Sequence, residues 1–175
     1  AGVICVITWN SRDKIDNGFL ICIGIAFFFI GSIDLLHTLA FKGMNIFTGY
    51  DADLPTQLWI AARYLEAVTF LIAPFLFVRR VNVGITFWGF LLVTASLVTL
   101  IFSGYFPACY IEGSGLTMFK IVSEYVICLI LLGAMALLSQ KKAYFSRDVL
   151  LLLYGAIIAT IFSELAFTSY VSVYG

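Results

Sequence analysis

Long runs of apolar residues follow one another along nearly the whole chain, and they constrain the fold more than any other feature. The first of these runs, at 1–9, is too short to cross a bilayer at about 1.5 Å per residue. Apolar residues make up 62% of the chain, whereas about 45–50% is usual in soluble domains. Five runs exceed the roughly 18 mainly apolar residues that a spanning helix needs: 18–41, 57–78, 83–106, 117–139 and 149–172. We therefore predict an all-α fold, a polytopic transmembrane helical bundle of five full spans and a partial first span.

Charge and motif content exclude several function classes. The net charge is zero and no basic tract is present, so we expect no nucleic-acid partner. The four cysteines form no CxxC pair, which argues against a zinc–thiolate site or a disulfide framework. We find no nucleophile–base constellation, P-loop or Rossmann fingerprint. Catalysis within this segment is therefore not expected.

The basic residues of the connectors predict the orientation of the bundle. Seven of them lie in one alternating set of connectors, at 10–17, 79–82 and 140–148. The other set, at 42–56 and 107–116, holds only Lys42, and Lys120 lies just inside the next span. Short loops rich in Lys and Arg stay in the cytoplasm. The first set is therefore predicted to be cytoplasmic and the second set to face outward.

With this orientation, the ionisable side chains inside the spans lie in the outer halves of those spans. The inner halves of the same spans carry none. Each costs about 2.5–3.5 kcal/mol at the centre of a bilayer, and less near its surface, so such groups tend to face the bundle interior and to pair. Asp34 with His37, and Arg63 with Glu66, are three residues apart and share a helix face. Lys120 and Glu124 are four residues apart.

We interpret these residues as an enclosed polar cluster that opens toward the outside and binds a ligand. Glu164 has no partner on its own helix, so it must reach another helix or a ligand, or carry a proton. The predicted ligand-binding residues combine the charged groups with two aromatic neighbours: Asp34, His37, Trp59, Arg63, Tyr64, Glu66, Glu124 and Glu164.

Other interpretations of the same residues stay open. The pairs are explained equally simply as structural ion pairs that fix helix packing, and Lys120 can extend to the surface. A haem or metal-binding membrane redox sensor is an alternative function, in which the ligands would come from His37, Asp34, Glu66 and Glu164. A single histidine cannot supply two axial haem ligands. A small transporter is a further alternative, but the apolar inner halves argue against a path across the membrane.

Four motifs carry a family resemblance: "TWNSR", "DLLHTLAFKGM", "LPTQLWIAARYLEA" and "SELAFTSY". They resemble the third class of bacterial membrane-associated sensor domains, the MASE-type family, over nearly the whole chain. The resemblance implies an N-terminal sensory input module whose output passes to a cytoplasmic histidine kinase or diguanylate cyclase (GGDEF) domain. It also implies further membrane sequence on both sides of this segment.

We accordingly expect residues 1–175 to form a single membrane-embedded sensor domain, truncated at both ends and lacking its effector domain. The expected location is the cytoplasmic (inner) membrane of a bacterium or archaeon. The expected partners are membrane lipids, a small-molecule ligand from the outer side and, through the full-length protein, a second copy of the chain. No cofactor is identified by the sequence.

Overall fold

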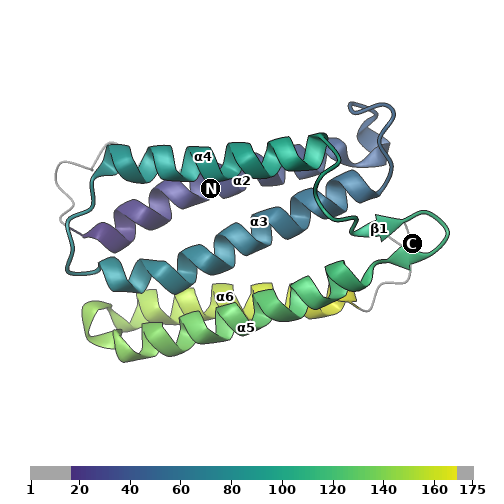
Figure 1. Ribbon diagram of the computed structural model, residues 1–175. Coiled ribbons are helices and arrows are strands. Elements are labelled where there is room, and N and C mark those ends of the chain that lie inside the picture. The colour runs from purple at the N-terminus through teal and green to yellow at the C-terminus, as the bar shows by residue number, and fades with distance from the viewer. Residues whose placement is uncertain (1–16, 169–175) are drawn as a thin grey trace.

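Five long helices dominate the computed structural model, which describes residues 17–168 (Figure 1). They are α2 (Gly18–Ala40), α3 (Asp53–Ile72), α4 (Val83–Phe102), α5 (Met118–Gln140) and α6 (Arg147–Thr168). All five are long and apolar enough to cross a membrane, with α3 counted together with the 3₁₀ segment Ala73–Leu76 that continues it. The predicted all-α transmembrane bundle is confirmed. The partial span at 1–9 lies outside the described residues.

Local sequence signals fix where the helices begin. The side chains of Asn17, Asn82 and Thr117 accept hydrogen bonds from backbone N–H groups in the first turns of α2, α4 and α5. Such N-caps satisfy donors that a helix start leaves without a partner. Pro55 lies in the first turn of α3, where the missing N–H costs nothing.

Helix α3 is the centre of the bundle, with α2 packed on one side and α5 on the other. Helix α4 packs mainly on α2, and α6 packs on α5 (Figure 1). The buried core runs along α3 in two hydrophobic clusters, one shared mainly with α2 and one shared mainly with α5. The two peripheral helices, α4 and α6, leave most of their apolar side chains on the outside of the bundle.

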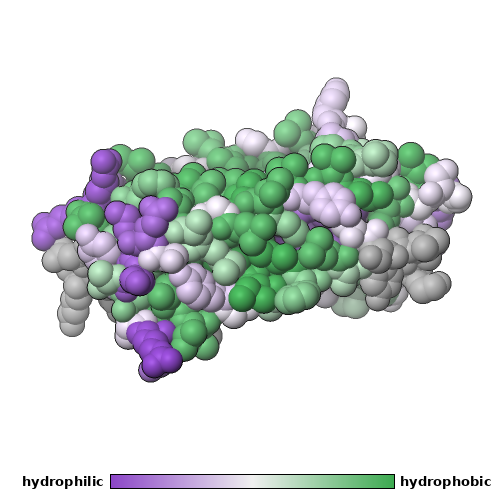
Figure 2. Space-filling view, turned by 90° about the horizontal axis from the view of Figure 1, so that it is seen from below, coloured by the Kyte–Doolittle hydropathy of each residue, from purple (hydrophilic) through white to green (hydrophobic). Residues whose placement is uncertain are grey.

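Strongly hydrophilic residues gather at one end of the bundle, while the flank that Figure 2 shows is largely hydrophobic. That end carries the α3–α4 and α5–α6 connectors, which hold Arg79, Arg80, Lys141 and Lys142. An apolar flank between polar ends matches a helix bundle that spans a bilayer. We refer to the basic end as the inner end and to the opposite end as the outer end, following the predicted orientation.

Several helix boundaries differ from the sequence prediction, and one element was missed. Helix α3 begins at Asp53 rather than 57, and α4 ends at Phe102 rather than 106. The outer connector after α4 contains a short hairpin, β1 (Tyr110–Ile111) with β2 (Gly115–Leu116). No strand was predicted in this connector, because two-residue strands leave no periodic pattern.

Candidate functional site

Arg63 joins α2 to α3 in the outer half of the bundle. Its Nη2 donates to both carboxylate oxygens of Asp34, at 2.8 and 3.1 Å. Its Nη1 donates to Glu66, one turn further along α3. A guanidinium presents several donors in a fixed plane, so it can serve two carboxylates at once. The predicted pairing of Arg63 with Glu66 is present, and Asp34 joins it from the neighbouring helix.

A second polar group joins α5 to α6. Lys120 forms an ion pair with Glu124, and both side chains are buried. The Nζ of Lys120 also donates to the backbone carbonyl oxygen of Phe167 on α6, at 3.2 Å, and lies 5.8 Å from the centroid of the Phe167 ring. The side chain of Lys120 therefore holds the outer end of α6 against α5 and does not extend to the surface.

Glu164 is the carboxylate that these contacts leave without a cationic partner. Its side chain is 0% exposed, it forms no ion pair among the described residues, and the hydrogen-bond donor that faces it is the indole Nε1 of Trp59. The groups that face it are Glu124, Arg63, Trp59 and Lys120. The indole Nε1 of Trp59 is also buried and does not complete a hydrogen bond of ordinary geometry. A buried charge in this condition is costly, so Glu164 calls for a functional explanation.

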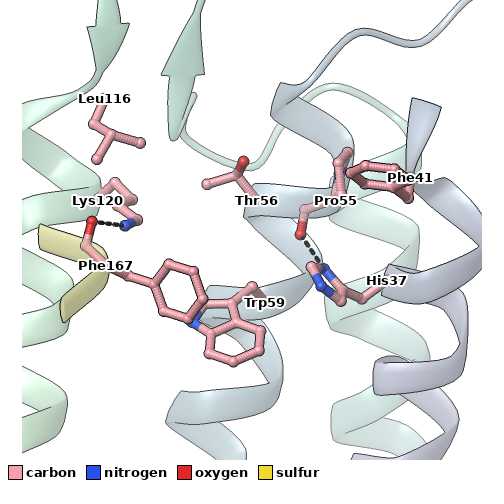
Figure 3. Close-up of a pocket in the computed structure, with 8 residues that line it drawn as sticks. All are labelled: His37, Phe41, Pro55, Thr56, Trp59, Leu116, Lys120 and Phe167. Atoms are coloured by element: carbon pink, nitrogen blue, oxygen red, sulfur yellow. Dashed lines mark hydrogen bonds between the residues drawn. The ribbon is translucent and has the colours of Figure 1, made fainter. Parts of the chain in front are cut away.

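A cavity of about 300 Å³ lies at the outer end, and Lys120 of the second polar group forms part of its wall. Its walls come from four helices, α2, α3, α5 and α6, from the residue that follows α2, and from the outer hairpin. The residues are His37, Phe41, Pro55, Thr56, Trp59, Leu116, Lys120 and Phe167 (Figure 3). Trp59 and Phe167 meet edge to face, with ring centroids 5.0 Å apart. Phe167 follows Glu164 by three residues on α6, so the cavity wall lies one helical turn from the buried carboxylate.

His37 contributes to the cavity wall, and the Arg63 group does not include it. Its Nδ1 is 2.8 Å from the carbonyl oxygen of Pro55 (Figure 3). A carbonyl oxygen can only accept, so Nδ1 carries the proton and Nε2 offers a lone pair when the ring is neutral. The imidazole also packs against Trp59, with ring centroids 5.4 Å apart.

The outer connector that carries Leu116 is fixed to the start of α3. The Oδ1 atom of Asp53 accepts hydrogen bonds from the backbone N–H groups of Cys109 and Tyr110, at 2.6 and 2.7 Å. The Nε2 atom of Gln57 donates to the carbonyl oxygens of Phe106 and Pro107, both at 3.2 Å. These four hydrogen bonds hold the hairpin over the outer end of the bundle.

Comparison with known protein families decides what kind of domain carries this site. The family model of a membrane-associated sensor domain, MASE3, matches residues 1–175. The chain belongs to the MASE3 family. The predicted resemblance is therefore confirmed, and the chain is a multi-pass membrane domain with a sensory input role. Neither the curated proteins nor the solved structures contain a match to it.

The MASE3 domain brings most of the predicted site residues together, in three adjoining groups. Asp34, Arg63 and Glu66 form one ion-paired group, and Lys120 and Glu124 form a second, with Glu164 near enough to interact with both electrostatically. His37 and Trp59 line the cavity. Tyr64 is half-buried and packs against the core shared with α5, away from the cavity wall.

Several residues of this site were not predicted from the sequence. Lys120 was not included among the ligand-binding residues, although its spacing from Glu124 was visible. Phe41, Pro55, Leu116 and Phe167 are apolar residues in an apolar sequence, and no pattern distinguishes them from residues that face lipid. Asp53 was assigned to a connector, because the start of α3 was predicted four residues too late, at Gln57.

The metal-binding alternative finds no support in the geometry. Between residues 17 and 168, no three His, Cys, Asp or Glu side chains are grouped so that they could hold a metal ion. Asp34 and Glu66, two of the four suggested ligands, are instead bonded to Arg63, and His37 donates to a backbone carbonyl.

Proposed function

We propose that this MASE3 domain binds a small-molecule ligand from the outer side of a bacterial or archaeal cytoplasmic membrane. The outer cavity is the proposed input site, and its occupancy controls a cytoplasmic histidine kinase or diguanylate cyclase later in the full-length protein. The observation that supports this most is the cavity of about 300 Å³ at the outer end, whose wall residue Phe167 lies one helical turn from Glu164, a fully buried carboxylate without an ion pair. Ionisable groups in spans are costly, so those that persist commonly serve function.

The walls of the cavity suggest how binding would reach the effector. His37, Trp59, Lys120 and Phe167 come from four different helices. Helix α6 is held at this level by the Lys120–Phe167 hydrogen bond and by the Trp59–Phe167 ring contact. A ligand that replaces either contact would shift α6 relative to α3 and α5, and chain that follows α6 would move with it. Dimerisation of the full-length protein is part of this proposal, because kinases and cyclases of these classes act as pairs.

The test uses the full-length receptor in its native membrane, with the output of its own effector domain as readout. Glu164→Gln keeps the shape of the side chain and removes its charge, and His37→Ala removes the hydrogen bond to Pro55. Glu112→Gln is the matched control, since Glu112 is an exposed carboxylate in the outer hairpin.

We expect Glu164→Gln and His37→Ala to change the output per receptor molecule at a normal membrane level, and Glu112→Gln to leave it unchanged. The proposal is wrong if both site variants keep the wild-type output, or if their output falls only in step with the amount of receptor. The polar groups would then serve packing alone.

A further inference from the structure

We propose that Glu164 and Glu124 share one proton in the contact between α5 and α6, and that this proton is a second input to the MASE3 domain. Glu164 is the acid, and Glu124 is the carboxylate that accepts its hydrogen bond. The inference goes beyond the proposed function, because the proton binds between two helices and not in the outer cavity.

Two contacts fix how α5 and α6 face each other. Near the outer end, the Nζ of Lys120 donates to the carbonyl oxygen of Phe167, at 3.2 Å. Further inward, the thiol of Cys128 donates to the carbonyl oxygen of Ile161, at 4.0 Å between sulfur and oxygen. Residues 120 and 128 of α5 therefore lie opposite residues 167 and 161 of α6.

Glu124 and Glu164 are the midpoints of this antiparallel register. Glu124 lies four residues from each contact residue of α5, and Glu164 lies three residues from each contact residue of α6. An α-helix turns by about 100° per residue, so both glutamates lie between their contact residues in direction as well as in height. Both side chains are 0% exposed, as a position inside the contact requires. The two carboxyl groups therefore face each other across the α5–α6 contact.

The buried charges in this part of the bundle balance only with one added proton. Among the described residues, two cations and three buried carboxylates meet here: Arg63, Lys120, Glu66, Glu124 and Glu164. The fourth carboxylate, Asp34, is 40% exposed. Arg63 pairs with Glu66, and Lys120 pairs with Glu124. Two facing carboxylates served by one ammonium cannot both ionise without a large cost, so the unpaired Glu164 takes the proton.

The surrounding side chains can satisfy a protonated Glu164. A carboxylic acid has one O–H donor and keeps acceptor capacity on its other oxygen. Glu124 has its ion pair with Lys120 but accepts no hydrogen bond of ordinary geometry from the described residues, so its oxygens are open to the O–H group. From α3, the indole Nε1 of Trp59 faces Glu164 as a donor to the carbonyl oxygen. Cys128 also lies at this contact, but its thiol donates to the backbone of α6.

The position of the pair connects it to the outer side and to α6. Lys120 and Phe167 lie one helical turn nearer the outer end and belong to the wall of the outer cavity, so the outer side is the nearer source of protons. When the proton leaves, two carboxylates repel each other inside a buried contact. Helix α6 packs on the bundle mainly through α5, so α6 is the element that moves, and the chain that follows it moves as well.

Infrared difference spectroscopy of the full-length receptor in lipid nanodiscs tests for the shared proton, because a carboxylic acid and a carboxylate absorb at different frequencies. The receptors are wild type, Glu164→Gln, Glu124→Gln and the control Glu112→Gln, which changes an exposed carboxylate of the outer hairpin. We expect an acid band in wild type and Glu112→Gln at neutral pH that fades as the pH rises. Glu164→Gln should lose this band. Glu124→Gln should lose it too, because Lys120 is then free to pair with Glu164 and no proton is needed.

A second measurement follows the output of the effector domain in proteoliposomes while the pH on the outer side alone is varied. His37 lines the outer cavity and is the rival proton acceptor, so His37→Ala is the matched comparison. We expect wild type, Glu112→Gln and His37→Ala to respond to the outer pH. Glu164→Gln should give one output at every pH, equal to the output that wild type reaches in acid, because an amide cannot lose the proton that holds α6.

The shared proton is disproved if wild type has no acid band at neutral pH, or if the band survives in Glu164→Gln. A band that persists in Glu124→Gln would show that burial alone protonates Glu164, and would overturn the pairing. Should Glu164→Gln fail to fold, the wild-type titration and Glu124→Gln decide the question. A pH response that His37→Ala abolishes, or a wild-type output that ignores the outer pH, would overturn the role of this proton as an input.

These outcomes are separable from a failure of the proposed function. A small molecule that changes the output of a receptor without a pH response would leave the outer cavity standing as the input site and remove only the proton. An output at fixed pH that stays at the wild-type level in both Glu164→Gln and His37→Ala would instead remove the proposed function, while the acid band would still report on the shared proton.

Discussion

Arg63 is the residue whose loss should cost the bundle most, and Arg63→Met tests this. Methionine keeps an unbranched side chain in the same space but removes the charge and all donors. The variant strands two carboxylates, Asp34 and Glu66, which both depend on the guanidinium. The two carboxylates differ in environment, so their contributions can be separated.

The exposed fractions of the side chains determine how much free energy of unfolding each substitution should cost. Arg63 is 13% exposed and Glu66 is 10% exposed, so their pair is effectively buried. Breaking a buried pair costs about 3–5 kcal/mol, because the remaining charge stays buried without a partner. Asp34 is 40% exposed, and pairs at such positions contribute only about 0–1 kcal/mol. Arg63→Met should therefore lower the free energy of unfolding by about 3–5 kcal/mol, and Asp34→Asn by about 1 kcal/mol or less.

Chemical unfolding of the purified domain in mixed micelles measures these differences, with Arg79→Met in the inner connector as a control that should stay within about 0.5 kcal/mol. Adding Glu66→Gln to Arg63→Met should recover much of the loss, since the stranded charge is gone. The reasoning fails if the double variant costs as much as the sum of the single ones, or if Asp34→Asn costs as much as Arg63→Met.

Three further changes probe the packing, the outer connector and the orientation. Gly18→Ala should destabilise the bundle by about 1–3 kcal/mol, because the added Cβ would lie 2.7 Å from one backbone carbonyl oxygen and closer to another. Gly89→Ala meets open space and should stabilise α4 by up to about 1 kcal/mol. Equal effects of the two substitutions in thermal unfolding would contradict this. Asp53→Ala should speed amide hydrogen exchange in the outer hairpin at least tenfold, through loss of two hydrogen bonds to a carboxylate, and unchanged protection would disprove the anchoring role. In a cysteine-free background, a membrane-impermeant thiol reagent outside intact cells should label Asn45→Cys and spare Ser146→Cys; the reverse pattern would invert the proposed orientation.

The bundle could be predicted from the sequence because each span is specified locally. A run of apolar residues long enough to cross a bilayer indicates a helix whatever its neighbours are. The N-caps at Asn17, Asn82 and Thr117 are also local signals. The start of α3 was missed because Asp53 and Gln57 are polar residues that resemble a connector, and their partners lie about fifty residues away in the outer loop.

The candidate site was only partly predictable, for a related reason. Pairs on one helix, such as Arg63 with Glu66, follow from spacing alone. The contact of Arg63 with Asp34, and that of Lys120 with the Phe167 carbonyl, depend on which helices are neighbours. Spacing contains no such information. A cavity is still harder to foresee, because it is a property of apolar walls that meet from four helices.

A structure of the full-length receptor in native lipid, determined by cryo-electron microscopy, tests the central claim most directly. The account predicts non-protein density in the outer cavity, in contact with Trp59 and Phe167 and extending toward Glu164. The same density should be absent or much weaker in the Glu164→Gln receptor, with the helices otherwise unchanged. A cavity filled by a lipid acyl chain in both receptors, or closed by its own side chains in both, would contradict the claim that this cavity is the input site.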